Sequence, residues 1–481
     1  MSVRPRVYLL SPKTYPPEVI AVAFAKTSRS PEPFDAIAAE LNADQSRRFH
    51  EKWVVGYGHA SVAEHAVLHI AVEGASRLAV EALEEPRLAS YTEKSTRYQR
   101  WDADAFVTPP ELEAHPLRAD YEATLRLLVD TYERAWEPLR AAIARRHPRR
   151  EGESEARWDR RVRSKFADVA RFLLPAAAVA NVGITINARL LAHSLRKWLA
   201  HPLAEVRQLA QRIKEVALAE TPTLVRYAEP NAYRATLRTT WAARSQAVPA
   251  PEGFPKNPVH LVHYDPDGEV RVLAAALTHA GRGPYAAYEA HVRGLDAAGR
   301  AELAADLLAA RGEHDAPPRA LEVASTTWDL VMDQGAYYEF KRHRMMTPLP
   351  QRLGVDLGYA VPRLLCEVGL MDAYREAMDA AARTYRRLAA ALGPEVAAYV
   401  VPNAYNRRVL ATLNLREAFH LLELRSAANA HFSIRRVALR MAEELAGVYP
   451  ALMAYLRLPP TTAARLEEEH FAAVAVSPAA G

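Results

Sequence analysis

One pattern of residues occurs twice in this chain: VYLLSPKTYPPEVIAVAFAKTSRS at residues 7–30 and VHLVHYDPDGEVRVLAAALTHAGRG at residues 259–283. In each copy the opening apolar run predicts a strand, and a turn with proline follows. A helical pattern comes next, at residues 19–26 and 270–278. Because the two copies are so far apart, they predict a duplicated domain and not a stack of short repeats.

Further landmarks recur in the same order in both halves. An apolar segment at residues 66–83, predicted as a helix, corresponds to residues 321–340, and the apolar alternation at residues 67–72 within it is typical of a strand. An apolar tetrapeptide ending in proline follows, and an asparagine, Asn187 or Asn414, lies twelve residues after that proline. We therefore expect two tandem α+β modules, each with a mainly antiparallel sheet flanked by helices. The predicted boundaries are 1–235 for the first module, 236–258 for a linker, 259–470 for the second module and 471–481 for a tail.

The composition is that of an ordinary globular protein. Of the 481 residues, 50% are apolar and 25% are charged, which is enough apolar material for large cores. The single cysteine, Cys366, excludes an intramolecular disulfide and a cysteine-based zinc site. No apolar run is long enough to span a bilayer, and the N-terminus lacks the apolar core of a signal peptide, so we expect a cytoplasmic protein.

The charge pattern favours small anionic ligands over nucleic acid. The net charge is +5, but the chain has no basic stripe with interleaved aromatic residues, so we do not expect nucleic-acid binding. No glycine-rich phosphate loop follows a predicted strand, which argues against a Rossmann-type dinucleotide site.

The densest group of cations lies in YEFKRHRMMT at residues 338–347, where Lys341 precedes Arg342, His343 and Arg344. Pairs of guanidinium groups hold phosphate or carboxylate, so this stretch predicts an anion-binding site. The alternative is a basic surface cluster at a helix end, where cations offset the helix dipole.

A second polar stretch, SYTEKSTRY at residues 90–98, has Glu93, Ser95 and Arg97 at near-alternate positions. Side chains at this spacing can line one wall of a phosphate or base pocket. The alternative is a polar loop with a capping box.

Histidines upstream of these stretches allow two interpretations. His59 and Ser61 precede an apolar segment, and Ser61 can act as a helix N-cap. His65 and His69 have the i, i+4 spacing of a metal-binding pair, but no third ligand stands out. We therefore predict no metal site.

Together these stretches resemble the signature of the flavin-dependent thymidylate synthase family. That signature is Arg-His-Arg, seven residues and then Ser-x-Arg-Tyr, with Gly-His-x-Ser/Thr-x-x-Glu-His upstream. The first half of this chain has GHASVAEH at residues 58–65 and STRY at residues 95–98, but EPR at residues 85–87 where Arg-His-Arg is expected. The second half has Arg-His-Arg at residues 342–344, but Arg352 at the serine position.

The complementarity between the halves continues downstream. The family has an arginine before the apolar-proline strand, matched by Arg171 in the first half and replaced by Ala398 in the second. It also has an arginine eleven residues after the asparagine, matched by Arg425 in the second half and replaced by Trp198 in the first. Glu339 stands where the family usually has glutamine. One near-complete set of family residues is thus divided between the two halves.

The resemblance implies an enzyme that uses FAD, reduced by NADPH, to transfer the methylene of methylenetetrahydrofolate to carbon 5 of dUMP, forming dTMP. Members of this family are homotetramers with sites shared between subunits, so two modules per chain imply a homodimer. The alternative is a catalytically degenerate relative that binds a flavin or nucleotide, or serves as a scaffold.

The resemblance also implies a role for individual residues. The residues implied in catalysis are Arg425, which would stabilise negative charge on the pyrimidine, and Ser95. The residues implied in cofactor binding are His59, Ser61, Glu93, Arg342, His343, Arg344, Asn187 and Asn414. The residues implied in substrate binding are Glu93, Ser95, Thr96, Arg97, Arg171, Glu339, Arg342 and Arg425. We expect a working site that combines Ser95, Arg97 and Arg171 with Arg342, His343, Arg344 and Arg425. We expect an inactive second site that combines Glu85, Pro86 and Trp198 with Arg352 and Ala398.

Overall fold

The computed structural model describes residues 6–28, 30–97, 99–101, 105–249 and 253–479. It divides the chain into two compact units that do not follow the order of the sequence. Unit 1 comprises Met1–Lys94, Phe106–His115 and Ala177–Ala250, and unit 2 comprises Ser95–Ala105, Pro116–Ala176 and Pro251–Gly481. A large part of the first half of the chain therefore belongs to the same unit as the second half.

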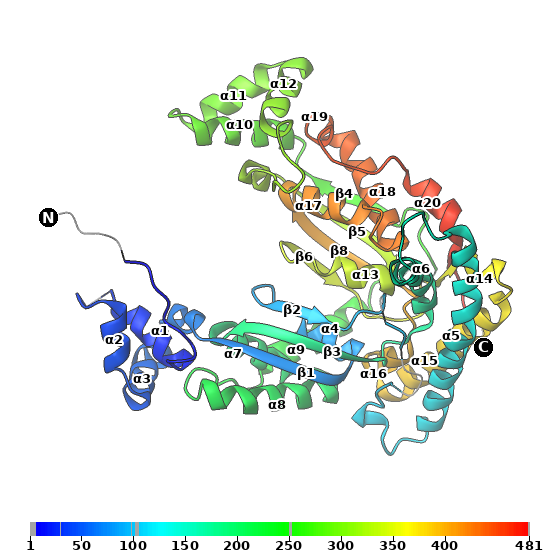
Figure 1. Cartoon of the computed structure of the whole chain (residues 1–481), viewed down its shortest axis with the longest axis horizontal. Helices are drawn as coiled ribbons and strands as arrows, with labels where there is room; N and C mark the ends of the chain where they lie inside the picture. Colours follow the sequence, from blue (N-terminus) through cyan, green and yellow to red (C-terminus); the bar gives the residue numbers. More distant parts are fainter. Residues whose placement is uncertain (1–5, 29, 98, 102–104, 250–252, 480–481) are drawn as a thin grey trace. The chain divides into compact units, whose positions relative to one another are not determined.

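Unit 1 is built on a three-stranded antiparallel sheet in the order β1-β3-β2 (Figure 1). Leu68, Ile70 and Val72 of β1 face the core, and the residues between them are exposed. The strands are β1 (Val67–Ser76), β2 (Ser90–Glu93) and β3 (Val179–Asn187). Helices of this unit include α1 (Pro17–Lys26), α2 (Phe34–Glu40), α3 (Ala43–Phe49), α4 (Arg77–Leu83), α7 (Ala188–Trp198), α8 (Ala204–Glu220) and α9 (Ala232–Ser245).

Unit 2 contains a four-stranded antiparallel sheet in the order β4-β5-β8-β6 and a separate pair, β7-β9. Helix α18 covers β4 and β5, and Trp328 of β5 is completely buried in the core. The strands are β4 (Val259–Tyr264), β5 (Ser325–Asp333), β6 (Met346–Pro350), β7 (Tyr359–Pro362), β8 (Asn406–Asn414) and β9 (Phe471–Val476). Helices of this unit include α5 (Arg118–Arg146), α6 (Glu155–Ala170), α10 (Gly268–Ala280), α11 (Tyr285–Gly294), α12 (Ala297–Leu308), α13 (Gln334–Phe340), α14 (Arg363–Glu367), α15 (Met371–Leu392), α16 (Pro394–Ala397), α17 (Leu415–Ser426), α18 (Phe432–Val448), α19 (Pro450–Met453) and α20 (Ala463–His470).

Strands β5, β8 and β6 of unit 2 pair in the same order as β1, β3 and β2 of unit 1. The corresponding strands β3 and β8 both end in an asparagine that caps the next helix. Oδ1 of Asn187 accepts a hydrogen bond from the Leu190 N–H at 2.9 Å, and Oδ1 of Asn414 accepts one from the Glu417 N–H at 2.9 Å. The fold therefore consists of two tandem α+β modules with antiparallel sheets, as the repeat predicts.

Both modules have a buried hydrogen bond between a serine hydroxyl and a carboxylate at the end of a strand. The strand supplies the serine in the first module and the carboxylate in the second. Ser76 ends β1, and its hydroxyl donates a hydrogen bond to Glu205 of α8 at 2.6 Å. Asp333 ends β5, and its carboxylate accepts a hydrogen bond from the hydroxyl of Ser433 in α18. All four side chains are buried. Each contact ties the end of a strand to the helix that packs on its sheet.

Helix α5 from the first half and helix α15 from the second half pack together inside unit 2. The hydroxyls of Thr124 and Thr384 lie 2.7 Å apart in the buried interface, and Arg387 forms an ion pair with Asp120 at 2.7 Å. Helix α6 packs against α5 (Figure 1). Arg171 follows directly after the end of α6. The end of α6 thereby belongs to the same unit as the second module.

The segment at residues 66–83 combines a confirmed and a wrong expectation. The strand alternation at residues 67–72 is confirmed as part of β1, whereas the helix expected over the whole segment is wrong, because α4 begins only at Arg77. The corresponding residues 321–340 also form a strand followed by a helix, β5 and then α13. The alternation of buried and exposed side chains outweighs the helical tendency of these apolar residues. The strand expected at the start of the first copy is also missing, because residues 7–10 form no regular structure.

The other elements expected for the repeated pattern are confirmed. Helices α1 and α10 cover residues 19–26 and 270–278, and β4 covers residues 259–264. Helix α9 runs to Ser245 and so occupies part of the segment predicted as a linker. The module boundaries themselves stay a prediction. In the described part of the chain, no helix is both long enough and apolar enough to cross a membrane.

Candidate functional site

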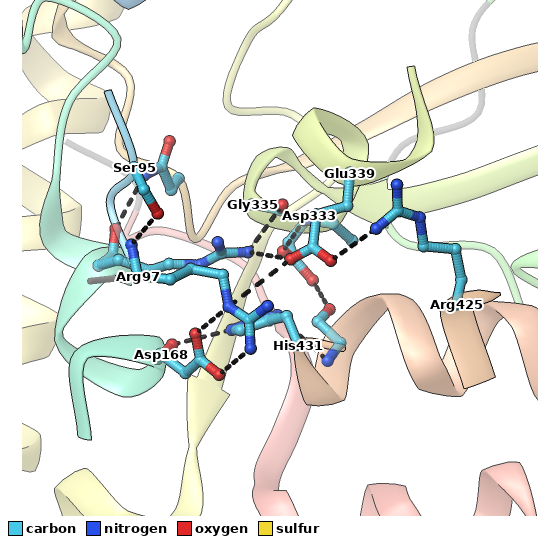
Figure 2. Close-up of polar contacts among 12 residues, drawn as sticks. Ser95, Arg97, Asp168, Asp333, Gly335, Glu339, Arg425 and His431 are labelled. Carbon is cyan, nitrogen blue, oxygen red and sulfur yellow. Dashed lines mark hydrogen bonds and ion pairs between the residues drawn. The ribbon is translucent and has the colours of Figure 1, made fainter. Parts of the chain in front are cut away.

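Five charged side chains meet in unit 2 and form the arginine–carboxylate cluster: Arg97, Asp168, Arg171, Glu339 and Arg425 (Figure 2). The first three come from the first half of the chain, and the last two come from the second half. They lie on the loop after β2, the end of α6, the turn that follows α6, helix α13 and helix α17. Packing of α5 and α6 within this unit therefore joins residues that the sequence separates widely.

Glu339 is the shared partner of the cluster. One carboxylate oxygen lies 3.5 Å from Nη2 of Arg171 and 4.0 Å from Nε of Arg97, and the other lies 3.4 Å from Nη1 of Arg425. The Glu339 side chain is 7% exposed, so water screens these ion pairs only weakly. One carboxylate thus compensates part of the charge of three guanidinium groups.

Arg97 is held in a fixed orientation by a bidentate ion pair. Its Nε and Nη2 donate to the two oxygens of Asp168 at 2.6 and 2.8 Å, and Nη2 also donates to the carbonyl of Asn429 at 3.0 Å. Burial raises the pKa of the Asp168 carboxyl, and the contact with Arg97 opposes this effect. Ser95 shapes the loop, since its hydroxyl oxygen accepts a hydrogen bond from the Arg97 N–H at 3.2 Å. Thr96 is buried between them.

Arg171 is fixed by its main chain as well as its side chain. Its Nη2 donates to the carbonyl of Gly335 at 2.8 Å, and its own carbonyl accepts from Nδ2 of Asn403 at 2.9 Å. Burial lowers the pKa of the Arg171 guanidinium, and Glu339 opposes that effect. Arg171 is thus a buried cation anchored between both halves of the chain.

His343 connects Arg425 to a further carboxylate. Its Nδ1 lies 2.8 Å from Oε1 of Glu417, and its Nε2 accepts a hydrogen bond from Nε of Arg425 at 2.9 Å. An acceptor at Nε2 requires the proton on Nδ1, so Nδ1 donates to Glu417. Burial lowers the pKa of His343, which keeps the ring neutral near pH 7. The neutral ring orients Arg425.

His431 supports the cluster from beneath. Its Nδ1 accepts a hydrogen bond from the Ser433 N–H at 3.3 Å, so Nε2 carries the proton and donates to the carbonyl of Asp168 at 2.8 Å (Figure 2). The ring is completely buried, and burial lowers its pKa well below the ordinary value. His431 thereby fixes the end of α6 against the start of α18.

A cavity of about 650 Å³ lies in unit 2 beside His420 and the start of α17. Five carboxylates and two guanidinium groups are among the described residues that line it. Both guanidinium groups are engaged: Arg416 with Glu322 at 2.7 Å and Arg457 with Glu423 at 3.1 Å. Asn414 and Glu417 also contribute to its wall, so the cavity adjoins the residues that orient Arg425.

Several predicted site residues have other surroundings. Glu93 lies in unit 1, in a buried ion pair with Arg77 at 3.0 Å. His59 and Ser61 are exposed in unit 1. Asn187 caps α7 in the same unit. Their roles at a cofactor or substrate stay predictions.

The two arginines of the Arg-His-Arg stretch differ from its histidine in their exposure to solvent. Arg342 and Arg344 are exposed, whereas His343 between them is buried. Arg352, at the serine position of the second half, forms an ion pair with Glu395 at 2.9 Å. Tyr98, the last residue of the first-half signature, lies outside the described residues.

Sequence reasoning missed three residues of this site: Asp168, Glu417 and His431. The sequence around Glu417 contains a pattern that indicates it, because Glu417 is the third residue of a helix that follows a capping asparagine. A carboxylate is favoured at that position. The first module has Leu190 at that position. Asp168 and His431 gave no comparable signal, because each acts through contacts between α6 and α18 that no local pattern records.

Comparison with known proteins agrees with the duplicated architecture. A family model for the thymidylate synthase complementing protein matches residues 9–223 and again residues 260–451. The chain therefore belongs to this family, that of the flavin-dependent thymidylate synthases, and carries its module twice. Within the described residues, no group of three or more His, Cys, Asp or Glu is arranged to hold a metal ion.

Relatives of two lengths are found. A UPF0159 protein of Chlamydia muridarum is 31% identical over 453 residues, which cover 89% of this chain and 85% of the relative. A flavin-dependent thymidylate synthase of Clostridium tetani is 26% identical over 219 residues, which cover 45% of this chain and 83% of that enzyme. A solved flavin-dependent thymidylate synthase of Helicobacter pylori, with FAD and dUMP, is 18% identical and matches 42% of this chain and 99% of its own, with a TM-score of 0.32.

Proposed function

We propose that this protein is an FAD-dependent thymidylate synthase that methylates dUMP to dTMP with methylenetetrahydrofolate and NADPH, and that it works as a homodimer. The observation that carries the proposal is the arginine–carboxylate cluster. The sequence divides one set of family residues between the two modules, and Arg97 and Arg171 of the first module lie within 4.0 Å of Glu339 of the second. Unselected loss of residues would not preserve one complementary set.

The substrate side of the site follows from charge. The three guanidinium groups of the cluster face two carboxylates, Asp168 and Glu339, and the remaining positive charge suits a nucleotide phosphate. We assign Arg97, Arg171 and Ser95 to the phosphate of dUMP. We assign Arg425 to the pyrimidine ring, where a cation stabilises the negative charge that develops as carbon 5 becomes nucleophilic. The neutral His343 keeps Arg425 in that orientation.

We assign the flavin ring of FAD to the cavity beside His420. The volume of about 650 Å³ suits a ring system, and Asn414 and His420 supply polar groups for its edge. The excess of carboxylates in the wall does not suit the diphosphate, which we assign instead to the exposed Arg342 and Arg344. Met345, directly after them, lines the cavity. FAD, when bound, would carry reducing equivalents from NADPH to the transferred one-carbon unit.

A second candidate function is binding without catalysis, as in a degenerate relative of the family. Glu339 favours it, because its carboxylate already occupies the centre of the three arginines that a substrate anion would need. A dUMP molecule must displace this carboxylate or bind beside it.

One experiment separates the two functions. The full-length protein is loaded with FAD and supplied with NADPH, methylenetetrahydrofolate and dUMP, and dTMP is measured by chromatography. Formation of dTMP supports the enzyme. If no dTMP forms while FAD or dUMP still binds in calorimetry, the enzyme is rejected and the binding protein remains.

A further inference from the structure

Unit 2 contains a second cavity, of about 770 Å³, with a charge opposite to that of the first. It lies between the ends of α5 and α6, the start of α18 and helix α20. Of the described residues that line it, five are lysine or arginine and two are aspartate or glutamate: Arg97, Arg146, Lys165, Arg435 and Arg465 against Asp168 and Glu469. The acidic cavity beside His420 has the reverse ratio. The lining charges therefore favour an anion in the second cavity over the first.

Two of the five cations have carboxylate partners, since Arg97 forms a bidentate pair with Asp168 and Arg146 forms an ion pair with Glu367. The other three, Lys165, Arg435 and Arg465, share the cavity with one further acid, Glu469. Burial lowers the pKa of Arg435, which shows that its surroundings disfavour the cation, and Glu469 opposes this effect. Nε of Arg435 donates to the carbonyl of Ser426 at 3.1 Å, so the side chain is held in place. A bound anion would stabilise these cations.

The shape and lining fit a small organic molecule and not a lone ion. A volume of about 770 Å³ falls in the range of small-molecule sites, which is roughly 300–1,000 Å³. Apolar groups lie beside the cations, including Phe432, whose ring stacks on His470 with 4.7 Å between centroids. Burial lowers the pKa of His470 to about 4, so this ring is neutral at pH 7. An apolar surface beside several guanidinium groups suits a ligand with both a ring or chain and phosphates.

The cavity is distinct from the reaction site but shares two residues of the arginine–carboxylate cluster with it. Arg97 and Asp168 line the cavity, whereas Ser95, Arg171, Glu339 and Arg425 do not. The Arg97 guanidinium is 4.0 Å from Glu339, so charge placed in the cavity acts on the same group as charge placed in the reaction site.

We propose that this cavity is a second ligand site of the protein, for a phosphorylated small molecule. The inference does not depend on thymidylate synthesis, because it rests on a cavity that most of the reaction-site residues do not line. Four of the five cations are arginines, whose planar forks match phosphate oxygens in pairs.

Binding of inorganic pyrophosphate to the full-length protein tests the proposal by isothermal titration calorimetry at low ionic strength. We expect saturable binding that weakens about tenfold in Arg435→Gln and in Lys165→Met, as each removes one charge-assisted contact. Arg160→Gln is the matched control, because Arg160 is an exposed residue of α6 outside the cavity. This control should bind pyrophosphate like the unaltered protein.

Three results would overturn the proposal. The first is the absence of saturable binding to the unaltered protein. The second is binding that weakens in Arg425→Gln but not in Arg435→Gln or Lys165→Met, which would assign pyrophosphate to the reaction site. The third is tighter binding of citrate than of pyrophosphate, which would assign the cavity to carboxylates. Circular dichroism confirms that each variant is folded, and the two cation variants test the cavity independently.

Discussion

Glu339 and Arg425 face each other at the centre of the arginine–carboxylate cluster, where Oε2 of Glu339 lies 3.4 Å from Nη1 of Arg425. The same carboxylate lies 3.5 Å from Nη2 of Arg171. A buried carboxylate between two guanidinium groups offsets their charge in the same way as a substrate anion would. This relationship leads to the first prediction.

Glu339→Gln removes the resident anion and should have two linked effects. The free protein should lose about 3 kcal/mol of stability, because three arginines lose a shared partner. Binding of dUMP should tighten about tenfold, because its phosphate no longer competes with a carboxylate. Thermal unfolding with and without dUMP measures both effects.

The matched control is Glu376→Gln, at an exposed position of α15 away from the cluster. It should change neither stability nor dUMP binding. Weaker dUMP binding in Glu339→Gln would show instead that Glu339 contacts the nucleotide directly and favourably.

Arg425→Ala should lower the turnover number about 10²-fold or more, in line with the loss of one well-placed electrostatic stabiliser. Its counterpart Trp198 is buried in unit 1 and donates from Nε1 to the carbonyl of Ala82 at 3.0 Å. Trp198→Ala should therefore cost about 3–5 kcal/mol of stability and leave turnover per folded molecule unchanged. An active protein in which Arg425→Ala keeps full turnover would place the reaction elsewhere.

Glu417→Leu copies the residue of the first module into the second. Nδ1 of His343 then loses its acceptor, so the ring no longer presents a fixed acceptor to Arg425. We expect the turnover number to fall about ten- to hundredfold with a smaller change in KM, as a hydrogen bond to a charged group is lost. The conservative Glu417→Gln keeps an acceptor oxygen and should restore much of the rate. Equal rates in all three proteins would contradict a positioning role for Glu417.

Stability should fall as pH drops below about 6.5. Burial lowers the pKa of His431 and keeps the ring neutral in the folded protein. As the pH falls, the histidine of the unfolded chain is therefore protonated first, which lowers the free energy of the unfolded state relative to the folded state. The contribution is complete above the ordinary histidine pKa and is lost below it, at about 1.4 kcal/mol per pH unit for each such histidine. Denaturant unfolding at pH 7, 6 and 5 measures the slope.

His431→Gln should reduce that slope by about one proton, since glutamine keeps a donor for the Asp168 carbonyl and does not titrate. His279→Gln serves as control, because His279 lies near the exposed end of α10. A stability that stays constant between pH 7 and pH 5 would mean that His431 is not neutral in the folded protein.

The local signals in the chain were sufficient for much of the fold. The helices at α1 and α10 and the strand β4 follow from short-range periodicity, because side-chain spacing alone determines which face of an element is buried. The segment at residues 66–83 carries two signals, since the alternation at residues 67–72 indicates a strand and the apolar content of the whole segment favours a helix. Pairing of β1 with β3 resolves the ambiguity, and that pairing is a long-range contact.

For the candidate site, the motifs indicate Arg97, Arg171 and Arg425, and the structure places all three beside Glu339. Their roles stay predictions, and the sequence does not indicate which side chains they contact. The uniform role expected for Arg-His-Arg did not allow for the burial of His343 between two exposed arginines. Burial of one residue in such a stretch depends on the helix that packs over it, here α17 with Glu417.

The amino-acid sequence by itself determined that the chain is a duplicated α+β protein of this family and that each module has lost a different part of one residue set. Those properties depend only on the order and spacing of residues, which folding does not alter. Only the tertiary structure decided that α6 belongs to the same unit as the second module, and that one carboxylate lies among three arginines. It also decided that one cavity of unit 2 is acidic and the other basic. The physical reason is that charge balance and burial depend on which side chains packing brings within a few ångströms, and these contacts join residues that are distant along the chain.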